Sequence, residues 1–75
     1  MLTGCTIFKT SFNVDGIEII GSIKYSSIES FMEIKYVRND RVYTEQKIYN
    51  GDINNESQMI SEMENFIDEF LNVSK

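Results

Sequence analysis

The sequence predicts an α+β fold: a four-stranded antiparallel β-meander followed by one C-terminal amphipathic α-helix packed on one sheet face (ββββα). This prediction depends on an apolar stripe of helical period in residues 53–73 and on two predicted hairpins that occupy residues 1–50. Residues 1–75 are expected to form a single domain, because a chain this short can bury only one hydrophobic core.

The predicted helix has apolar residues at spacings of three and four, which is the period of one helix face. Asn54 or Asn55 can cap its first turn, with Gln58 three residues after Asn55 as in a capping box. The stripe must be buried against the sheet. It comprises Met59, Ile60, Met63, Phe66, Ile67, Phe70 and Leu71.

The first hairpin is predicted from the Asp15-Gly16 pair, because a two-residue type I′ turn needs a positive φ at both positions. Val14 then faces Ile17, and apolar residues alternate away from the turn on both strands. The same register sets three further pairs on the face that should receive the helix: Phe12 with Ile19, Thr10 with Gly21 and Phe8 with Ile23.

The second hairpin joins strands at about residues 30–38 and 42–49. A two-residue turn at Asn39-Asp40 would set Arg38 opposite Arg41 and mix apolar with charged residues on both faces. A three-residue loop over residues 39–41 is therefore predicted, since it sets opposite charges and aromatic rings against each other. The pairs expected from this register are Met32 with Ile48, Ile34 with Gln46, Tyr36 with Thr44, Phe31 with Tyr49, Glu33 with Lys47, Lys35 with Glu45 and Val37 with Tyr43.

The sheet face away from the helix is predicted to remain uncovered. It mixes apolar side chains with lysines and is too apolar to be left in water, so we expect a homodimer interface or a partner-binding face there. Pairing through an edge strand is another route to a homodimer. The residues expected on this face are Ile7, Ile20, Phe31, Val37, Tyr43, Tyr49, Lys35 and Lys47.

Charge is distributed unevenly along the chain. Residues 1–50 contain six acids and six bases, whereas residues 51–75 contain six acids and one base, so the second segment accounts for the whole net charge of −5. Acids in the last turns of a helix oppose its dipole, and this charge disfavours nucleic acid as a ligand. We expect the helix to bind a basic surface of a protein partner; the alternative is that its acids only confer solubility or pair with lysines of the strands. The acids concerned are Glu62, Glu64, Asp68 and Glu69.

Enzymatic chemistry is not expected. The chain has no histidine to activate its single Cys5 and no phosphate-binding glycine pattern, so neither a metal site nor a cofactor is predicted. No apolar run approaches the about 20 residues that span a bilayer, and Cys5 cannot form an internal disulfide, so a cytoplasmic location is expected. The segment Leu2-Thr3-Gly4-Cys5 matches a bacterial lipoprotein cleavage pattern, but only Met1 precedes it.

The function expected from the sequence is that of a small acidic protein-interaction module. Its size, acidity and composition are typical of regulators or inhibitors that phages and mobile elements direct against nucleic-acid-binding surfaces of host proteins. One alternative is a structural homodimeric module of a phage or bacterial assembly. The other follows from the ββββα order, which resembles the topology of the Whirly and PUR families and implies single-stranded nucleic acid stacked on the tyrosines and Phe31. None of those families' sequence motifs is present.

Overall fold

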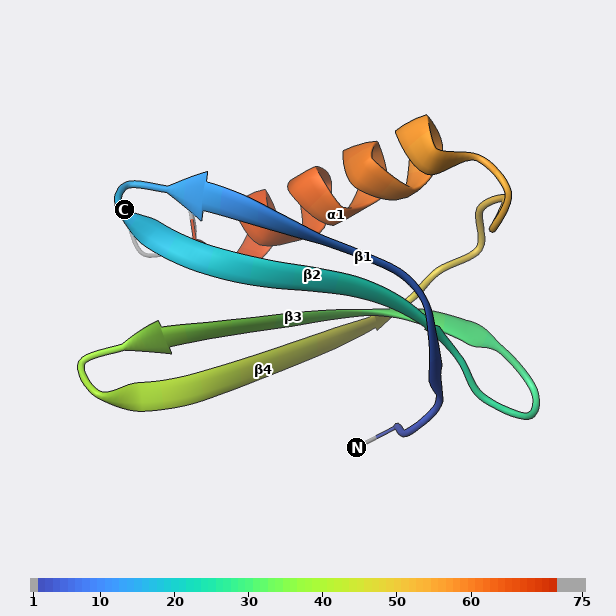
Figure 1. Ribbon diagram of the computed structural model, residues 1–75, viewed down its shortest axis with the longest axis horizontal. Helices are drawn as coiled ribbons and strands as arrows, with labels where there is room; N and C mark the ends of the chain where they lie inside the picture. The colour runs from blue at the N-terminus through green and yellow to red at the C-terminus, as the bar shows by residue number, and fades with distance from the viewer. Residues whose placement is uncertain (1, 72–75) are drawn as a thin grey trace.

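Four antiparallel strands follow one another in the order β1-β2-β3-β4 and α1 closes the chain (Figure 1), which confirms the predicted fold class. The structure is a computed structural model that describes residues 2–71. The elements are β1 (Cys5–Val14), β2 (Ile17–Tyr25), β3 (Ser30–Arg38), β4 (Arg41–Ile48) and α1 (Glu56–Leu71). Within the described residues, no helix is both long and apolar enough to cross a membrane.

The β1–β2 hairpin has the predicted two-residue turn and register. Asp15 and Gly16 have φ values of 53° and 81°, as a type I′ turn requires. All four predicted pairs are present, from Val14 opposite Ile17 to Phe8 opposite Ile23. The register shifts between Thr6 and Phe8, so Ile7 lies at a bulge near the start of β1.

The β3–β4 hairpin corrects the prediction of a three-residue loop. Asn39 and Asp40 have φ values of 53° and 63°, and Arg38 lies opposite Arg41. Asn and Asp tolerate the left-handed region, and a type I′ turn matches the twist of the two strands. The two arginines are exposed at the tip, where solvent screens their repulsion. Because the pairing differs by one residue from the prediction, every side chain of β4 lies on the opposite face.

The core lies between α1 and the sheet, and the helix contributes the predicted apolar stripe. Its buried centre consists of Ile19, Ile23, Met32, Ile34, Tyr49, Met59, Met63, Phe66 and Ile67. Partly buried apolar residues surround this centre: Phe8, Phe12, Val14, Ile17, Tyr36, Phe70 and Leu71. Burial of one helix stripe against one sheet face therefore accounts for the main core.

The helix begins at Glu56, three residues later than predicted, because the preceding residues form the cap. The Asn55 side-chain oxygen accepts a hydrogen bond from the Gln58 backbone N–H (3.1 Å), as predicted for a cap. The Gln58 side chain accepts instead from the Asp52 N–H (3.0 Å) and so ties the connecting loop to the first turn. The predicted helix end at Val73 lies outside the described residues.

We predict that Gly21→Val destabilises the fold, because this glycine lies where the helix approaches the sheet. A Cβ atom at position 21 would be 2.9 Å from the Met63 sulfur and 2.9 Å from a ring carbon of Phe12. Overpacking of this kind costs about 1–3 kcal/mol of unfolding free energy, measurable by urea denaturation. Ser11→Val adds a similar side chain on an exposed site of β1 and should change that free energy by less than about 0.5 kcal/mol. Equal losses in the two variants would contradict this packing.

Candidate interaction surfaces

The structure divides the residues predicted for the uncovered sheet face between three locations. Ile20, Lys35 and Val37 lie on that open face as predicted, and Ile7 is exposed at the bulge in β1. Phe31 is also on the open face but has no exposed surface. The other three predicted residues lie on the helix side of the sheet or in its core: Tyr43, Lys47 and Tyr49.

Tyr43 and Lys47 are on the helix side because of the two-residue turn, which corrects their predicted positions. The Tyr43 ring stacks on Tyr36 (5.3 Å between centroids), which in turn stacks on Phe70 (5.5 Å). The Lys47 ammonium lies 2.6 Å from a Glu69 carboxylate oxygen and 5.9 Å from the centre of the Phe66 ring. These contacts fasten edge strand β4 to the C-terminal half of α1.

Tyr49 is part of the main core rather than of the open face. Only 4% of its surface is exposed, and its hydroxyl donates a hydrogen bond to the Asp52 carbonyl (3.0 Å). Burial raises the pKa of Tyr49, and the nearby charges of Glu62 and Asp52 raise it further. Because Tyr43 lies on the helix side and both Tyr49 and Phe31 are buried, the open face lacks the rings on which the single-strand-binding alternative depended.

A buried carboxylate network occupies the middle of the open face. Glu33 is 5% exposed, and its carboxylate lies 2.7 Å from the Lys24 ammonium and 4.0 Å from that of Lys35. The Gln46 side-chain amide donates to it at 3.1 Å. Burial alone would raise the pKa of Glu33, but the bonds from Lys24 and Gln46 and the charges of Lys24 and Lys35 together hold it below its ordinary value. The predicted partner Lys47 lies on the other face.

The segment that precedes β1 covers one end of the open face. The Gln46 side chain accepts a hydrogen bond from the Leu2 N–H and donates one to the Leu2 carbonyl, both at 2.9 Å. In Figure 1 the start of the chain bends across β2 and β3 towards β4. This crossing explains why Phe31, which faces away from the main core, is completely buried. Nothing in the sequence pattern signals the crossing.

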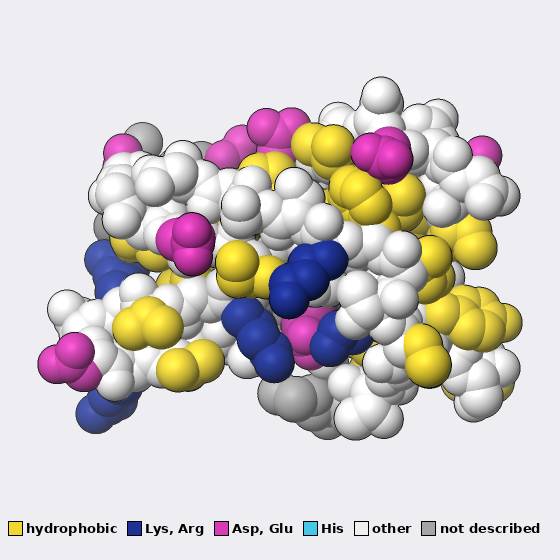
Figure 2. Space-filling view, viewed as in Figure 1, with side chains coloured by type: hydrophobic (Ala, Val, Ile, Leu, Met, Phe, Trp, Pro, Cys, Tyr) yellow, Lys and Arg dark blue, Asp and Glu magenta, His cyan; other side chains and the backbone are white. Residues whose placement is uncertain are grey.

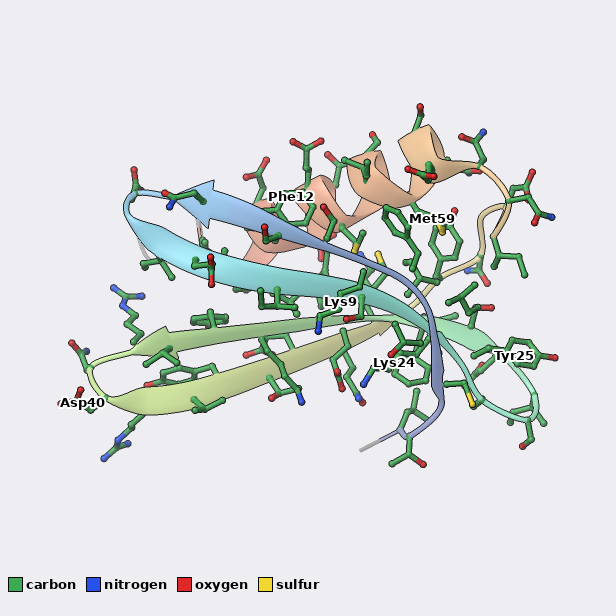
Figure 3. All side chains as sticks on the ribbon, in the orientation of Figure 1. Lys9, Phe12, Lys24, Tyr25, Asp40 and Met59 are labelled. Atoms are coloured by element: carbon green, nitrogen blue, oxygen red, sulfur yellow. The ribbon has the colours of Figure 1, made fainter. Side chains whose placement is uncertain are left out.

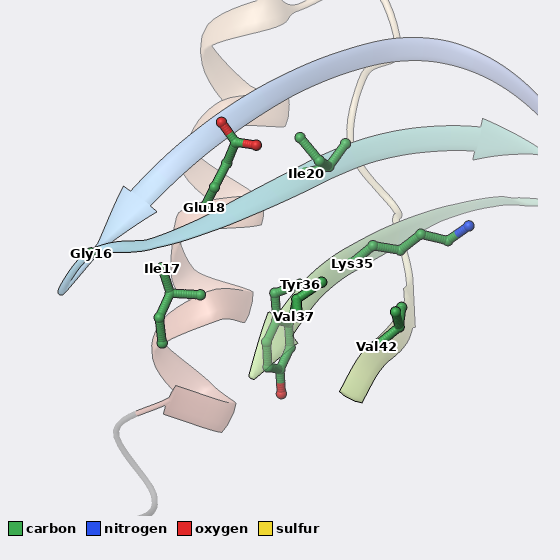
Figure 4. Close-up of a pocket in the computed structure, with 8 residues that line it drawn as sticks. All are labelled: Gly16, Ile17, Glu18, Ile20, Lys35, Tyr36, Val37 and Val42. Carbon is green, nitrogen blue, oxygen red and sulfur yellow. The ribbon is translucent and has the colours of Figure 1, made fainter. Parts of the chain in front are cut away.

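The other end of the open face is bare, because the two hairpins diverge towards their tips. Pairing between β2 and β3 ends at Ile19 and Tyr36. Beyond that pair lies a shallow hollow of about 410 Å³ (Figure 4). Figure 2 shows apolar side chains exposed in this region. Five residues around the hollow form what we call the tip patch: Glu18, Ile20, Lys35, Val37 and Val42.

The four predicted acids of α1 are all exposed and form two rows. Glu64 and Asp68 face β1, where they line a hollow of about 180 Å³ with Phe12 and Val14. Glu62 and Glu69 lie on the β4 side, where Glu69 pairs with Lys47. Ser61 and Asn65 form the exposed ridge between the rows, as the helical period requires. The helix itself contains five acids and no base.

The two surfaces of the molecule therefore differ in charge. The acids of α1 lie on one side, and three lysines lie on the open face of the sheet, with Lys9 and Lys24 labelled in Figure 3 and Lys35 beside Glu33.

Cys5 is an exposed thiol at the start of β1, so it is a strand residue and not a core residue. Among residues 2–71, no group of three or more His, Cys, Asp or Glu side chains is placed to hold a metal ion.

Comparison with known proteins gives no match: no protein-family model fits the chain, and neither the curated proteins nor the solved structures contain one that is significantly similar to it.

We predict that Glu33 stabilises the fold only while it is ionised. Since its folded-state pKa is below the ordinary 4.5, its contribution is complete above that pH and is lost as pH falls through the lower folded value. Glu33→Gln leaves Lys24 without its partner and should cost about 1–3 kcal/mol of unfolding free energy at neutral pH.

Urea denaturation of both proteins at a series of pH values checks this expectation. The difference between wild type and Glu33→Gln should shrink as the pH falls below 4.5. Glu64→Gln, which neutralises an exposed acid, should change the neutral-pH stability by less than about 0.5 kcal/mol. A Glu33→Gln deficit that is the same at every pH would show that the ionised carboxylate is not the source of the stability.

Proposed function

We propose that the protein is an interaction module that inserts the outer side of α1 into a basic groove of a partner protein. The observation that supports this most directly is the arrangement of the helix acids, which form two exposed rows on either side of the Ser61 and Asn65 ridge. A rod with acids on both flanks is complementary to a groove with basic walls, whereas a flat basic surface would meet only one row at a time.

The acids reduce the stability of the helix itself. The last turn contains no base, and Glu64 and Asp68 are like charges four residues apart. Each of these effects costs a few tenths of a kcal/mol, up to about 1 kcal/mol for a charge near the helix end. Among residues 2–71, Glu69 is the one acid of this group that forms an ion pair, with Lys47 at 2.6 Å. Glu62, Glu64 and Asp68 are therefore the residues that we assign to the partner.

The hollow beside β1 fits the side chain of a partner's lysine or arginine. Its apolar lining comes from Phe12, Val14 and Ile67, and two carboxylates stand at its rim, Glu64 and Asp68. A long basic side chain can pack its methylene groups on such a lining while its charged end bonds to a carboxylate. The hollow thus provides the apolar contact that charge complementarity alone lacks.

A basic groove is typical of a protein that binds nucleic acid, and this helix would occupy the place of the phosphates. The protein would then regulate or inhibit such a partner, as the acidity of the sequence suggests. A structural role in an assembly is the remaining alternative, and it is supported by the bare apolar part of the open face. Direct stacking of nucleic acid has lost its support, because the rings lie elsewhere.

We predict that neutralising the helix acids abolishes partner capture and makes the protein slightly more stable. The helix variant combines Glu62→Gln, Glu64→Gln and Asp68→Asn and keeps the Glu69–Lys47 pair. Removing like charges and acids that oppose the dipole should raise the unfolding free energy by up to about 1 kcal/mol. The captured proteins should be basic, and heparin should displace them from the immobilised wild-type protein.

A charge-matched control variant removes three acids outside the helix, through Asp15→Asn, Glu29→Gln and Asp40→Asn. The two turn positions tolerate Asn, because both have a positive φ. This variant has the same net charge as the helix variant, so it should still capture the wild-type partners from a bacterial lysate. Capture that is lost equally in both variants would mean that net charge, and not the helix surface, is recognised. Capture that survives in the helix variant would overturn the proposal.

A further inference from the structure

The tip patch has an apolar centre with one charge on each side. Val37 and Val42 are opposite each other on β3 and β4, and they are 59% and 70% exposed. Figure 4 shows Glu18 and Lys35 on opposite sides of Ile20 and Val37. Exposed aliphatic side chains that adjoin a hollow are typical of a surface that meets another protein.

We propose that the tip patch binds the tip patch of a second copy of this chain in a two-fold dimer. In such an interface, residue i of one copy meets residue j of the other, and the reverse contact forms as well. A two-fold axis that runs between Glu18 and Lys35 brings Glu18 of each copy next to Lys35 of the other copy. The valines and Ile20 of the two copies then meet at the centre. One surface therefore supplies both halves of two ion pairs.

A second copy fits this surface better than a partner of one charge sign. A purely basic or purely acidic partner would be attracted by one of the two flanking residues and repelled by the other. Lys35 is available for a new contact, because it lies 4.0 Å from Glu33, whose carboxylate is already held by Lys24 at 2.7 Å. Lys35 therefore makes one long ion pair with Glu33, and its exposed side chain can make a further contact.

Two other routes to self-association are less favourable. The opposite end of the open face is covered by the segment that contains Leu2 and bonds to Gln46. The edge of β1 contains the bulge at Ile7 and the charged Lys9, and both features hinder pairing of one sheet edge with another. Ile7, Tyr25 and Ile48 are also exposed apolar residues of the sheet, but they lie at the end that this segment crosses and not beside the tip patch.

The dimer is expected to be weak. The whole molecule measures 34 × 24 × 19 Å, so half of one sheet face is smaller than the about 800 Å² per partner of a standard interface. The interface also leaves the outer side of α1 free in both copies, because that side is on the far side of the sheet from the tip patch. The inference is therefore independent of the function proposed above.

Sedimentation from micromolar to millimolar protein concentration tests the dimer. The wild type should shift from monomer to dimer as concentration rises. Glu18→Lys alone and Lys35→Glu alone should each raise the dissociation constant about tenfold, since each creates two like-charge contacts. An equimolar mixture of these two variants should again form dimers, because every contact then joins opposite charges.

Two further variants guard against loss of folding and against a general effect of charge. Val37→Thr combined with Val42→Thr keeps the β-branched shape at exposed sites and should also weaken the dimer. Lys9→Glu reverses a charge on the same face outside the tip patch and should leave the association unchanged. A wild type that is monomeric throughout would overturn the proposal, and so would association that charge reversal at positions 18 and 35 does not alter.

Discussion

The backbone of Asn39 and Asp40 determines which side chains of β4 meet the helix. With positive φ at both residues, the connection between β3 and β4 contains two residues and not three. A change of one residue would turn the whole strand over, because successive side chains alternate between faces. This turn is what brings Lys47 to Glu69 on one face and leaves Val42 exposed on the other. The tip patch therefore has Val42, and the helix surface has the ion pair of Glu69, because of the backbone at this hairpin tip.

The same register produces the network around Glu33. It places Gln46 opposite Glu33, so that one side-chain amide can bond both the carboxylate and the backbone of Leu2. A carboxylate on a partly covered face is stable only when charged and polar groups compensate the loss of water. Lys24 and Gln46 supply that compensation, and no side-chain nitrogen or oxygen buried among the described residues lacks a hydrogen-bond partner. Through Gln46, the network thus joins the segment that crosses this end of the sheet to the buried carboxylate of Glu33.

The sequence was sufficient for the parts of the fold that have a strong local signal. Asp15-Gly16 specifies a single turn, and the stripe around Met63 and Phe66 admits only one helix orientation. For the second hairpin, two registers offered cross-strand pairs worth a few tenths to about 1 kcal/mol each, so local pairing could not decide between them. The decisive contacts are those between β4 and the helix, such as the ion pair of Lys47 with Glu69.

Part of each candidate surface could likewise be predicted from the sequence, and part could not. Exposure of the helix acids follows from the helical period alone, and all four are exposed. On the open face, Ile20, Lys35 and Val37 were placed correctly because the β2–β3 pairing does not depend on the second turn. Tyr43 and Lys47 were predicted on the wrong face of the sheet, because the predicted β3–β4 register was wrong. The burial of Phe31 could not be foreseen, since the strand pattern does not signal that Leu2 bonds to Gln46, 44 positions away, on the same face. If both proposals hold, a dimer would present two acidic helices on opposite sides, and binding to a partner with two basic grooves would strengthen the dimer by linkage.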